Sequence, residues 1–283
     1  MTGRSTTPVT ATHMVMQVTS VVDAIQPVSC CSAFYEQDWV RHLAEDIFHP
    51  GGEELTQKTI AAMNLHPGAG IADLGCGTGT SALILAAEPG LNISAIDISA
   101  DNIRRAQDRL SAANRAPGNV RFQQADAHEL PFEDAEFDGV LAECTFSLFA
   151  NQQAVLAEIK RVLKPDGQLG ITDMAVGGPL PEDIASVVAP WTCLMDAVDQ
   201  QAYSDTFTRA GFAIREFSDE STGLTRLIST LKRKLLMLGV GTALTGVDAP
   251  QIDIGEIKHW LDRFNEEVEK GTIRYLRFNL QKT

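Results

Sequence analysis

The chain has 283 residues and no long uninterrupted hydrophobic run, which argues against a membrane-spanning segment. Its most apolar candidate, residues 235–244, is too short and directly follows three basic residues, so we expect a buried helix or a partner surface there. Residues 1–20 lack the basic start and the small-residue cleavage pattern of a secretory signal. These absences lead us to expect a flexible tail at 1–20 and a cytoplasmic protein.

Positive charge is also scarce, because 23 lysines and arginines stand against 37 aspartates and glutamates, for a net charge of −14. A field of this sign repels phosphate and argues against nucleic acids and anionic membranes as general partners. The acidity also serves solubility, and the basic stretch 232–234 leaves a local partner open. A small-molecule substrate is therefore favoured.

The run IADLGCGTGT at 71–80 is the most informative stretch of the chain. An apolar strand reaches Asp73 and turns through Gly75, Gly77 and Gly79 into a predicted helix. Glycines at such a turn permit positive φ and let a ligand approach the backbone, while the helix start offers unpaired N–H groups. The dinucleotide pattern G-x-G-x-x-G is absent. The run predicts a nucleoside cofactor site.

Three further predicted strands end on polar residues. Residues 91–98 (LNISAIDI) carry Asp97, residues 120–124 lead into Ala125-Asp126-Ala127, and residues 137–142 lead into Glu143-Cys144. In an open parallel sheet the ligand crevice lies at the carboxyl ends of the strands. We therefore expect these four strand ends to meet at one edge.

Together the motifs DLGCGTGT, AIDIS, QQADAHELPFEDAEFDGV and AEIKRVLKPDGQLGITD resemble those of class I S-adenosylmethionine-dependent methyltransferases, over about residues 70–211. The resemblance implies an α/β fold, a doubly wound and mostly parallel sheet of seven strands (Rossmann-like). Its last strand should insert antiparallel beside the fifth and sixth. It also implies S-adenosylmethionine as the cofactor.

The resemblance assigns cofactor roles along that edge. Asp73 should serve the methionine end, Asp97 the ribose hydroxyls, and Asp126 with the Ala127 backbone the adenine amine, while Ile98 packs on the adenine ring. Gly75, Gly77 and Gly79 should line the loop beneath the cofactor. Glu143 is expected to orient a ligand or to bind the preceding helical region. An isolated carboxylate at such a place is more often a solvated strand end or a helix cap, but the joint spacing favours the cofactor.

The chain divides into predicted segments around this core. Residues 1–20 form the tail, 21–66 a helical lid that breaks at His49-Pro50-Gly51-Gly52, 67–217 the cofactor-binding core, 218–271 a helical insertion and 272–283 the final core strand. Strands and helices should alternate from 71 to 173. The insertion is expected to cap the pocket, to form a homodimer surface, or merely to pack on the sheet.

Five cysteines bear on the methyl acceptor, and without an export signal we expect them to be reduced. Cys76 lies inside the glycine loop and is expected to pack. The segments ECTFSL at 143–148 and WTCL at 191–194 look like the cysteine-bearing segments of arsenite methyltransferases. That resemblance implies a metalloid held by thiolates of Cys144, Cys193 and one of Cys30 or Cys31. Soft thiolates suit such a centre. No metal ion is expected beyond this metalloid position.

Two alternatives remain open. In the first, the acceptor is a small organic metabolite methylated on oxygen, nitrogen or carbon, with His49 or Glu143 as the general base. In the second, the chain binds S-adenosylmethionine or a metalloid without turnover and signals to a partner through the insertion. Tyr35 and Trp39, four residues apart, are candidates for an aromatic wall near the sulfonium, although core packing is the commoner role.

Overall fold

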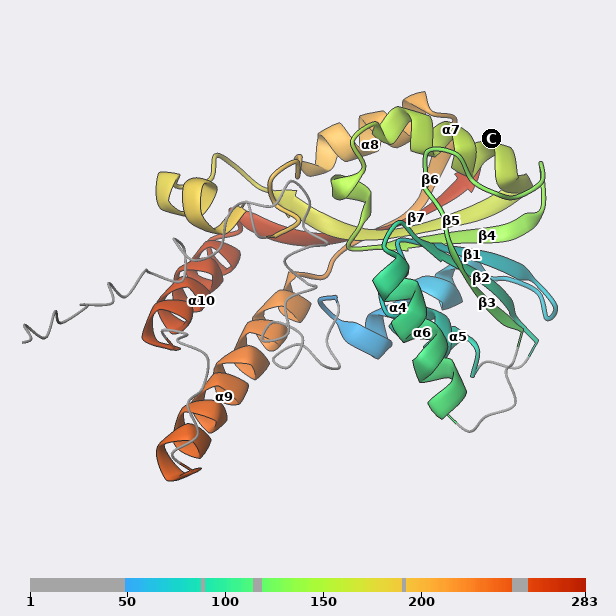
Figure 1. The fold of residues 1–283 in the computed structure, drawn as a ribbon. Coiled ribbons are helices and arrows are strands. Elements are labelled where there is room, and N and C mark those ends of the chain that lie inside the picture. Colours follow the sequence, from blue (N-terminus) through green and yellow to red (C-terminus); the bar gives the residue numbers. More distant parts are fainter. Residues whose placement is uncertain (1–48, 88–89, 114–118, 190–191, 246–253) are drawn as a thin grey trace, which may run out of the picture.

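The computed structural model describes residues 49–283, with gaps at 88–89, 114–118, 190–191 and 246–253 (Figure 1). At 238–245 only the helix backbone is described. The predicted tail and most of the predicted lid, with Cys30, Cys31, Tyr35 and Trp39, lie outside the described residues.

A seven-stranded sheet of order β3-β2-β1-β4-β5-β7-β6 forms the centre of the molecule. Strands β1 to β5 run parallel, and β7 lies antiparallel between β5 and β6, as the resemblance implies. The strands are β1 Gly70–Leu74, β2 Asn92–Asp97, β3 Val120–Gln124, β4 Phe137–Glu143, β5 Leu163–Val176, β6 Phe212–Asp219 and β7 Ile273–Lys282. The class I fold is therefore confirmed.

Helices cover both faces of this sheet. Figure 1 shows α7 and α8 above it and α4, α5 and α6 below. Side-chain caps start several of them, because Ser99, Asn151 and Asp199 each accept a hydrogen bond from the backbone N–H three residues on. The helices are α4 Gly52–Met63, α5 Thr80–Leu85, α6 Ala100–Ala112, α7 Gln152–Val162, α8 Gln200–Arg209, α9 Ser221–Thr245 and α10 Ile254–Glu269, with a 3₁₀ turn at Phe146–Leu148 and a π-helix at Ile184–Val188.

The expected alternation of strands and helices is wrong at one place. Residues 125–136, between β3 and β4, are turns and loops rather than a helix. The segment contains Pro131, and Arg161 of α7 holds it through bonds to the carbonyls of Leu130 and Phe132. The crossover from β3 to β4 therefore runs as a loop fixed by a neighbouring helix.

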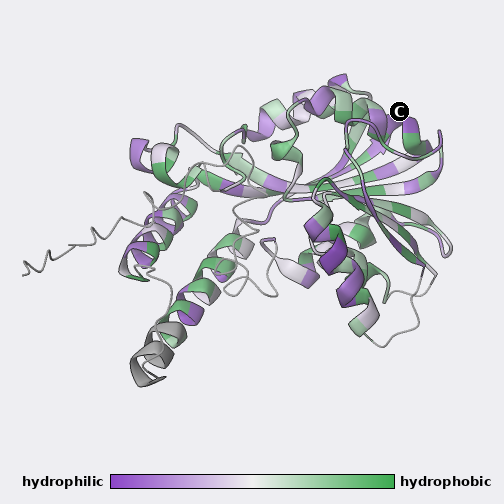
Figure 2. Ribbon diagram, viewed as in Figure 1, coloured by the Kyte–Doolittle hydropathy of each residue, from purple (hydrophilic) through white to green (hydrophobic). Residues whose placement is uncertain are grey.

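Buried side chains form three clusters. One lies between the sheet and α7 and α8, and a second lies on the opposite face against α5. The third joins β5 and β7 to the segment after β5 and to α9 and α10, which project from one end of the sheet (Figure 1). Figure 2 shows mostly apolar strands in the interior and alternating polar and apolar residues along the outer helices. Among the described residues, no helix combines the length and the apolar character needed to span a bilayer.

Candidate cofactor and acceptor site

The glycine loop follows β1, and its three glycines serve different purposes. All three have positive φ, at +68° for Gly75, +53° for Gly77 and +81° for Gly79. A Cβ on Gly75 would lie 2.3 Å from Thr145 Oγ1, and one on Gly79 would lie 2.7 Å from the Phe122 ring. A Cβ on Gly77 would meet no atom of the described residues within 4 Å. Close packing therefore requires glycine at 75 and 79, whereas the described residues leave space beside Gly77.

Asp97 at the end of β2 ties this loop to the next helix. Its Oδ2 accepts from Gly77 N at 2.8 Å, and its Oδ1 accepts from Ser99 N at 2.8 Å and from Asn102 Nδ2 at 3.2 Å. The carboxylate is buried and anchored by backbone amides, so its orientation is fixed toward the loop. This placement is compatible with the predicted ribose contact.

Asp73 and Glu143 end the neighbouring strands β1 and β4, and both are buried. Burial, with the nearby charges of Glu143 and Asp97, raises the pKa of Asp73 well above its usual value. Asp73 Oδ2 and Glu143 Oε1 are buried oxygens that have no hydrogen-bond partner among the described residues. A buried polar atom left unpaired is unfavourable, and two such oxygens at one edge suit a cationic donor group.

Glu143 also binds the predicted lid region, in agreement with one of its two expected roles. Its Oε2 accepts from Thr56 Oγ1 of α4 at 2.9 Å and from Ser81 Oγ of α5 at 2.6 Å. His49 Nε2 lies 3.6 Å from the same oxygen, and its Nδ1 lies 3.2 Å from the carbonyl of Pro50. His49 is thus a buried member of this network rather than a turn cap at the surface.

The predicted adenine contacts lie at the ends of β2 and β3. Ile98 is 60% exposed, which leaves its side chain available to a flat ring. Asp126 Oδ1 accepts from the backbone N–H of His128 at 2.9 Å and lies 2.7 Å from His128 Nδ1, and these bonds lower the pKa of Asp126. Ala127 beside it is buried. His128 was not anticipated from the sequence.

These residues fit S-adenosylmethionine. The unpaired oxygens of Asp73 and Glu143 suit the ammonium of its methionine part, and the open space at Gly77 admits a ligand against the backbone. Asp97, Ile98 and Asp126 continue along the same edge toward the ends of β2 and β3. The cofactor residues predicted from the sequence are therefore brought together.

The cysteines separate into two kinds. Cys144 Sγ and Cys193 Sγ lie 3.5 Å apart, although one follows β4 and the other lies in the segment after β5. Cys193 is 3% exposed and Cys144 is half-buried. Cys76 packs against the cluster beside α5, as expected, and burial raises the pKa of its thiol. Two of the four predicted acceptor ligands thus form a pair.

Apolar side chains surround this thiol pair. Both cysteines belong to the cluster that includes Leu194, Tyr275 and, from the insertion, Leu224 and Phe264. On the outer side, Arg263 of α10 holds Asp183, at the start of the π-helix, with two bonds of 2.8 and 3.2 Å. The insertion therefore packs against the segment that carries Cys193.

Asp173 and Ser147 are further residues of this region that the sequence did not single out. Asp173 is 2% exposed, and burial raises its pKa to about 7 against the opposing hydrogen bonds from Ser147. The signal in the sequence was the ITD ending of the fifth strand, a carboxylate at the same edge as Asp73 and Asp97. A serine in a short 3₁₀ turn gives no such signal.

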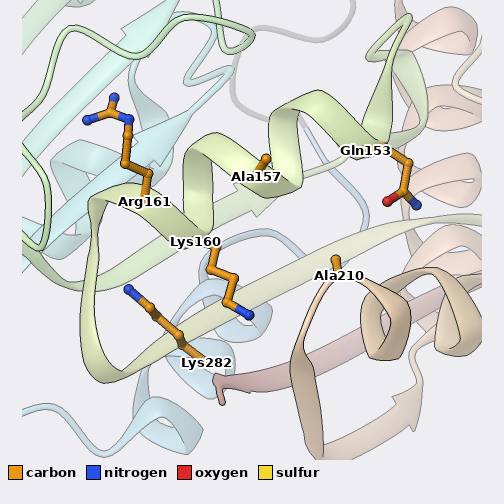
Figure 3. A pocket seen from close by; sticks show the side chains of 6 residues that line it. All are labelled: Gln153, Ala157, Lys160, Arg161, Ala210 and Lys282. Atoms are coloured by element: carbon orange, nitrogen blue, oxygen red, sulfur yellow. The ribbon is translucent and has the colours of Figure 1, made fainter.

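A shallow depression of about 440 Å³ lies elsewhere, lined by Gln153, Ala157, Lys160, Arg161, Ala210 and Lys282 (Figure 3). These residues come from α7, the end of α8 and the end of β7. The depression contains none of the predicted site residues and is separate from the site at the carboxyl ends.

Comparison with known proteins places the chain among methyltransferases. A family model described as a methyltransferase domain matches residues 65–211. The O-methyltransferase resE of Aspergillus sclerotiorum is 30% identical over 71% of this chain and 76% of its own length. An arsenite methyltransferase of Halobacterium salinarum is 31% identical over 58% of this chain and 42% of its own length.

Among solved structures, a phosphoethanolamine N-methyltransferase 2 of Haemonchus contortus superposes with a TM-score of 0.75. It is 19% identical, and the match covers 91% of this chain and 61% of that protein. At this identity the likeness concerns the fold.

Proposed function

Because the chain belongs to the methyltransferase domain family, we propose that it is an S-adenosylmethionine-dependent enzyme whose acceptor is a thiophilic metalloid, arsenite or a related species. The methyltransferase assignment follows from the family and from the relatives named methyltransferases. The acceptor is the proposal, and a single observation carries it. The thiols of Cys144 and Cys193 lie 3.5 Å apart in the acceptor region.

The spacing suits two sulfur atoms that share one centre. Thiolates on a tetrahedral zinc ion lie at about 2.3 Å from the metal, which places the sulfurs less than about 4 Å from each other. A disulfide requires about 2.05 Å. Arsenous acid would condense with the two thiols, and each As–S bond formed would release one water. The arsenic keeps its lone pair.

When bound, S-adenosylmethionine would supply an electrophilic methyl group that the arsenic lone pair could accept, with S-adenosylhomocysteine as the leaving group. Asp73 and Glu143 would hold the cofactor ammonium, and Asp97 the ribose. Apolar side chains of one buried cluster pack around both thiols. Correct placement of two reactants contributes several kcal/mol, about 7 or more in favourable cases. Neither reacting group needs a protein base.

A third thiolate from Cys30 or Cys31 belongs to this proposal. Both residues lie outside the described residues, so their part rests on the sequence resemblance alone. The two described thiols would supply the other two ligands.

The names of the relatives favour a second candidate, methylation of a small organic molecule on oxygen. For that reaction the sequence suggested His49 or Glu143 as the base. Both nitrogens of His49 lie within 3.4 Å of groups of the protein, namely Pro50 O, Thr56 Oγ1 and Ser81 Oγ. Glu143 Oε2 already accepts hydrogen bonds from two hydroxyls, and the proposal assigns Glu143 Oε1 to the cofactor ammonium.

The test is turnover by the purified full chain with S-adenosylmethionine, arsenite and glutathione. S-adenosylhomocysteine and methylated arsenic are followed together, and a parallel assay offers a panel of phenols and hydroxylated polyketides. The metalloid proposal expects both products with arsenite. Turnover with an organic hydroxyl alone would replace it by the second candidate. Tight cofactor binding without turnover of any acceptor would favour a binding protein.

A further inference from the structure

Asp173 holds the 3₁₀ turn that follows Cys144. Its Oδ2 accepts from Ser147 N at 2.6 Å, and its Oδ1 accepts from Ser147 Oγ at 2.9 Å and from Met174 N at 2.7 Å. Asp173 and Ser147 are 2% and 1% exposed. A carboxylate with both oxygens bonded in this way fixes the turn in one place on the sheet.

Ser147 also reaches the other cysteine. Its Oγ lies 3.2 Å from the backbone carbonyl oxygen of Cys193. Cys193 Sγ in turn lies 3.5 Å from Cys144 O as well as from Cys144 Sγ. The chain from Cys144 to Ser147, the contact of Ser147 with Cys193 and the contacts of Cys193 with Cys144 therefore form a closed ring.

The backbone at Cys144 shows that this ring constrains the thiol. Cys144 has φ +54°, in the left-handed region that residues other than glycine rarely adopt. Such a conformation persists only where the surroundings determine it, and it concentrates at functional sites. Here Cys144 N donates to Thr172 O at 2.7 Å, and the turn after it is held by Asp173.

We propose that Asp173 and Ser147 are positioning residues that set the separation of the Cys144 and Cys193 thiols. Asp173 fixes Ser147 through the backbone N–H of Ser147, and the single hydroxyl proton of Ser147, shared between Asp173 Oδ1 and Cys193 O, links the turn to the backbone of Cys193. The benefit for catalysis rests on the proposed function, because only a shared thiophilic acceptor needs the two sulfurs at one distance. The geometric role can be tested without turnover.

Phenylarsine oxide is a suitable probe, because one molecule condenses with two neighbouring thiols and releases one water. The probe is titrated into full-length protein carrying Cys30→Ser and Cys31→Ser, so that the adjacent cysteines of the sequence do not compete. In this background we expect one equivalent bound, with the loss of two titratable thiols. Failure of this protein to bind the probe with two thiols would overturn the proposal.

The positioning pair is tested by Ser147→Ala, Asp173→Asn and the hydroxyl-retaining Ser147→Thr. Loss of one hydrogen bond is worth about 1 kcal/mol, so we expect Ser147→Ala to weaken probe binding about fivefold to tenfold. Asp173→Asn should weaken it similarly, and Ser147→Thr should restore most of the affinity. Ser111→Ala, which removes a comparable bond on exposed α6, should leave it unchanged.

S-adenosylmethionine affinity separates positioning from general loss of structure, because the predicted cofactor residues, on β1, β2 and β4 and after β3, include neither Ser147 nor Asp173. We expect Ser147→Ala and Asp173→Asn to bind S-adenosylmethionine as tightly as the parent protein and to lose only affinity for the probe. If Ser147→Ala does not fold, Asp173→Asn decides in its place. Unchanged probe affinity in the folded variants would overturn the proposal.

Arsenite kinetics on the chain with its natural cysteines then separate the two claims. Positioning predicts that Ser147→Ala raises the KM for arsenite while the KM for S-adenosylmethionine stays the same. If the parent binds the probe but does not methylate arsenite, the proposed function fails while the affinity series still decides the positioning role.

Discussion

Cys144 and Cys193 bring their thiols to 3.5 Å across 49 residues of sequence. The pair depends on two unrelated local structures, a left-handed residue at the end of β4 and a segment that follows β5. Because the fold places both at the carboxyl edge of the sheet, the pair lies at the same edge as the cofactor residues.

Replacement of either thiol should impair arsenite methylation and spare cofactor binding. Cys144→Ser and Cys193→Ser each remove one soft ligand, and a serine hydroxyl is a poor substitute for a soft centre. We expect kcat/KM for arsenite to fall at least about tenfold, a loss of about 1.4 kcal/mol. S-adenosylmethionine affinity, measured by calorimetry on the same variants, is the internal control. Full activity of both variants would exclude the metalloid site.

The glycines of the loop should respond differently to alanine. The Cβ of Gly77→Ala meets no atom of the part of the chain that the structure describes, so its main stability penalty is the left-handed backbone, about 1 kcal/mol. Its Cβ enters the open space, and we expect S-adenosylmethionine affinity to fall about tenfold. Urea unfolding and calorimetry measure the two effects.

Gly75→Ala is the matched comparison, because its Cβ would collide with Thr145 Oγ1. We expect a larger loss of stability than for Gly77→Ala. Thr145→Ala added to Gly75→Ala should return part of that stability. Equal effects of the two glycine variants on stability and affinity would contradict the assignment.

Asp173 should make folding stability depend on pH in an unusual direction. Its pKa is about 7 in the folded protein and about 4 when unfolded, so the folded state binds the proton more tightly. The stability that this group contributes is complete below about pH 4 and is lost as the pH rises through 7. Between pH 5 and pH 8 the loss is at most about 3 kcal/mol.

Urea unfolding of the wild-type protein and of Asp173→Asn at both pH values isolates this effect from that of other carboxylates. The stability of the wild type relative to the variant should be lower at pH 8 than at pH 5. An identical difference at the two pH values would show that Asp173 titrates normally.

Arg277 on β7 should make a large contribution to folding stability at the β6–β7 end of the sheet. Its side chain is fully buried, donates to Ser218 Oγ and Asn279 Oδ1, and pairs with Glu216 and Glu220. Arg277→Ala removes these bonds and leaves a cavity, so we expect a loss of about 3 kcal/mol or more. Chemical denaturation measures it. Arg215→Ala, which truncates an exposed side chain of β6, is the control and should change stability little.

The sequence predicted well where one local pattern determines one element. The run 120–124 became β3, 137–142 lies within β4, and the cofactor carboxylates reached one edge, because apolar runs in a parallel sheet leave few alternatives. A helix was expected between β3 and β4, and the loop found there was not predicted because a distant residue, Arg161, holds it. Ser147 escaped for the same reason, since its partners lie 26 and 46 residues away.

The position of β7 has a consequence for biosynthesis. β6 pairs within the sheet through β7, and β7 follows the two helices of the insertion along the chain. A ribosome therefore completes β1 to β5 long before the strand that secures β6 has been made. We expect the cofactor edge to form while the chain is still growing, whereas β6 has to wait for residues 273–282.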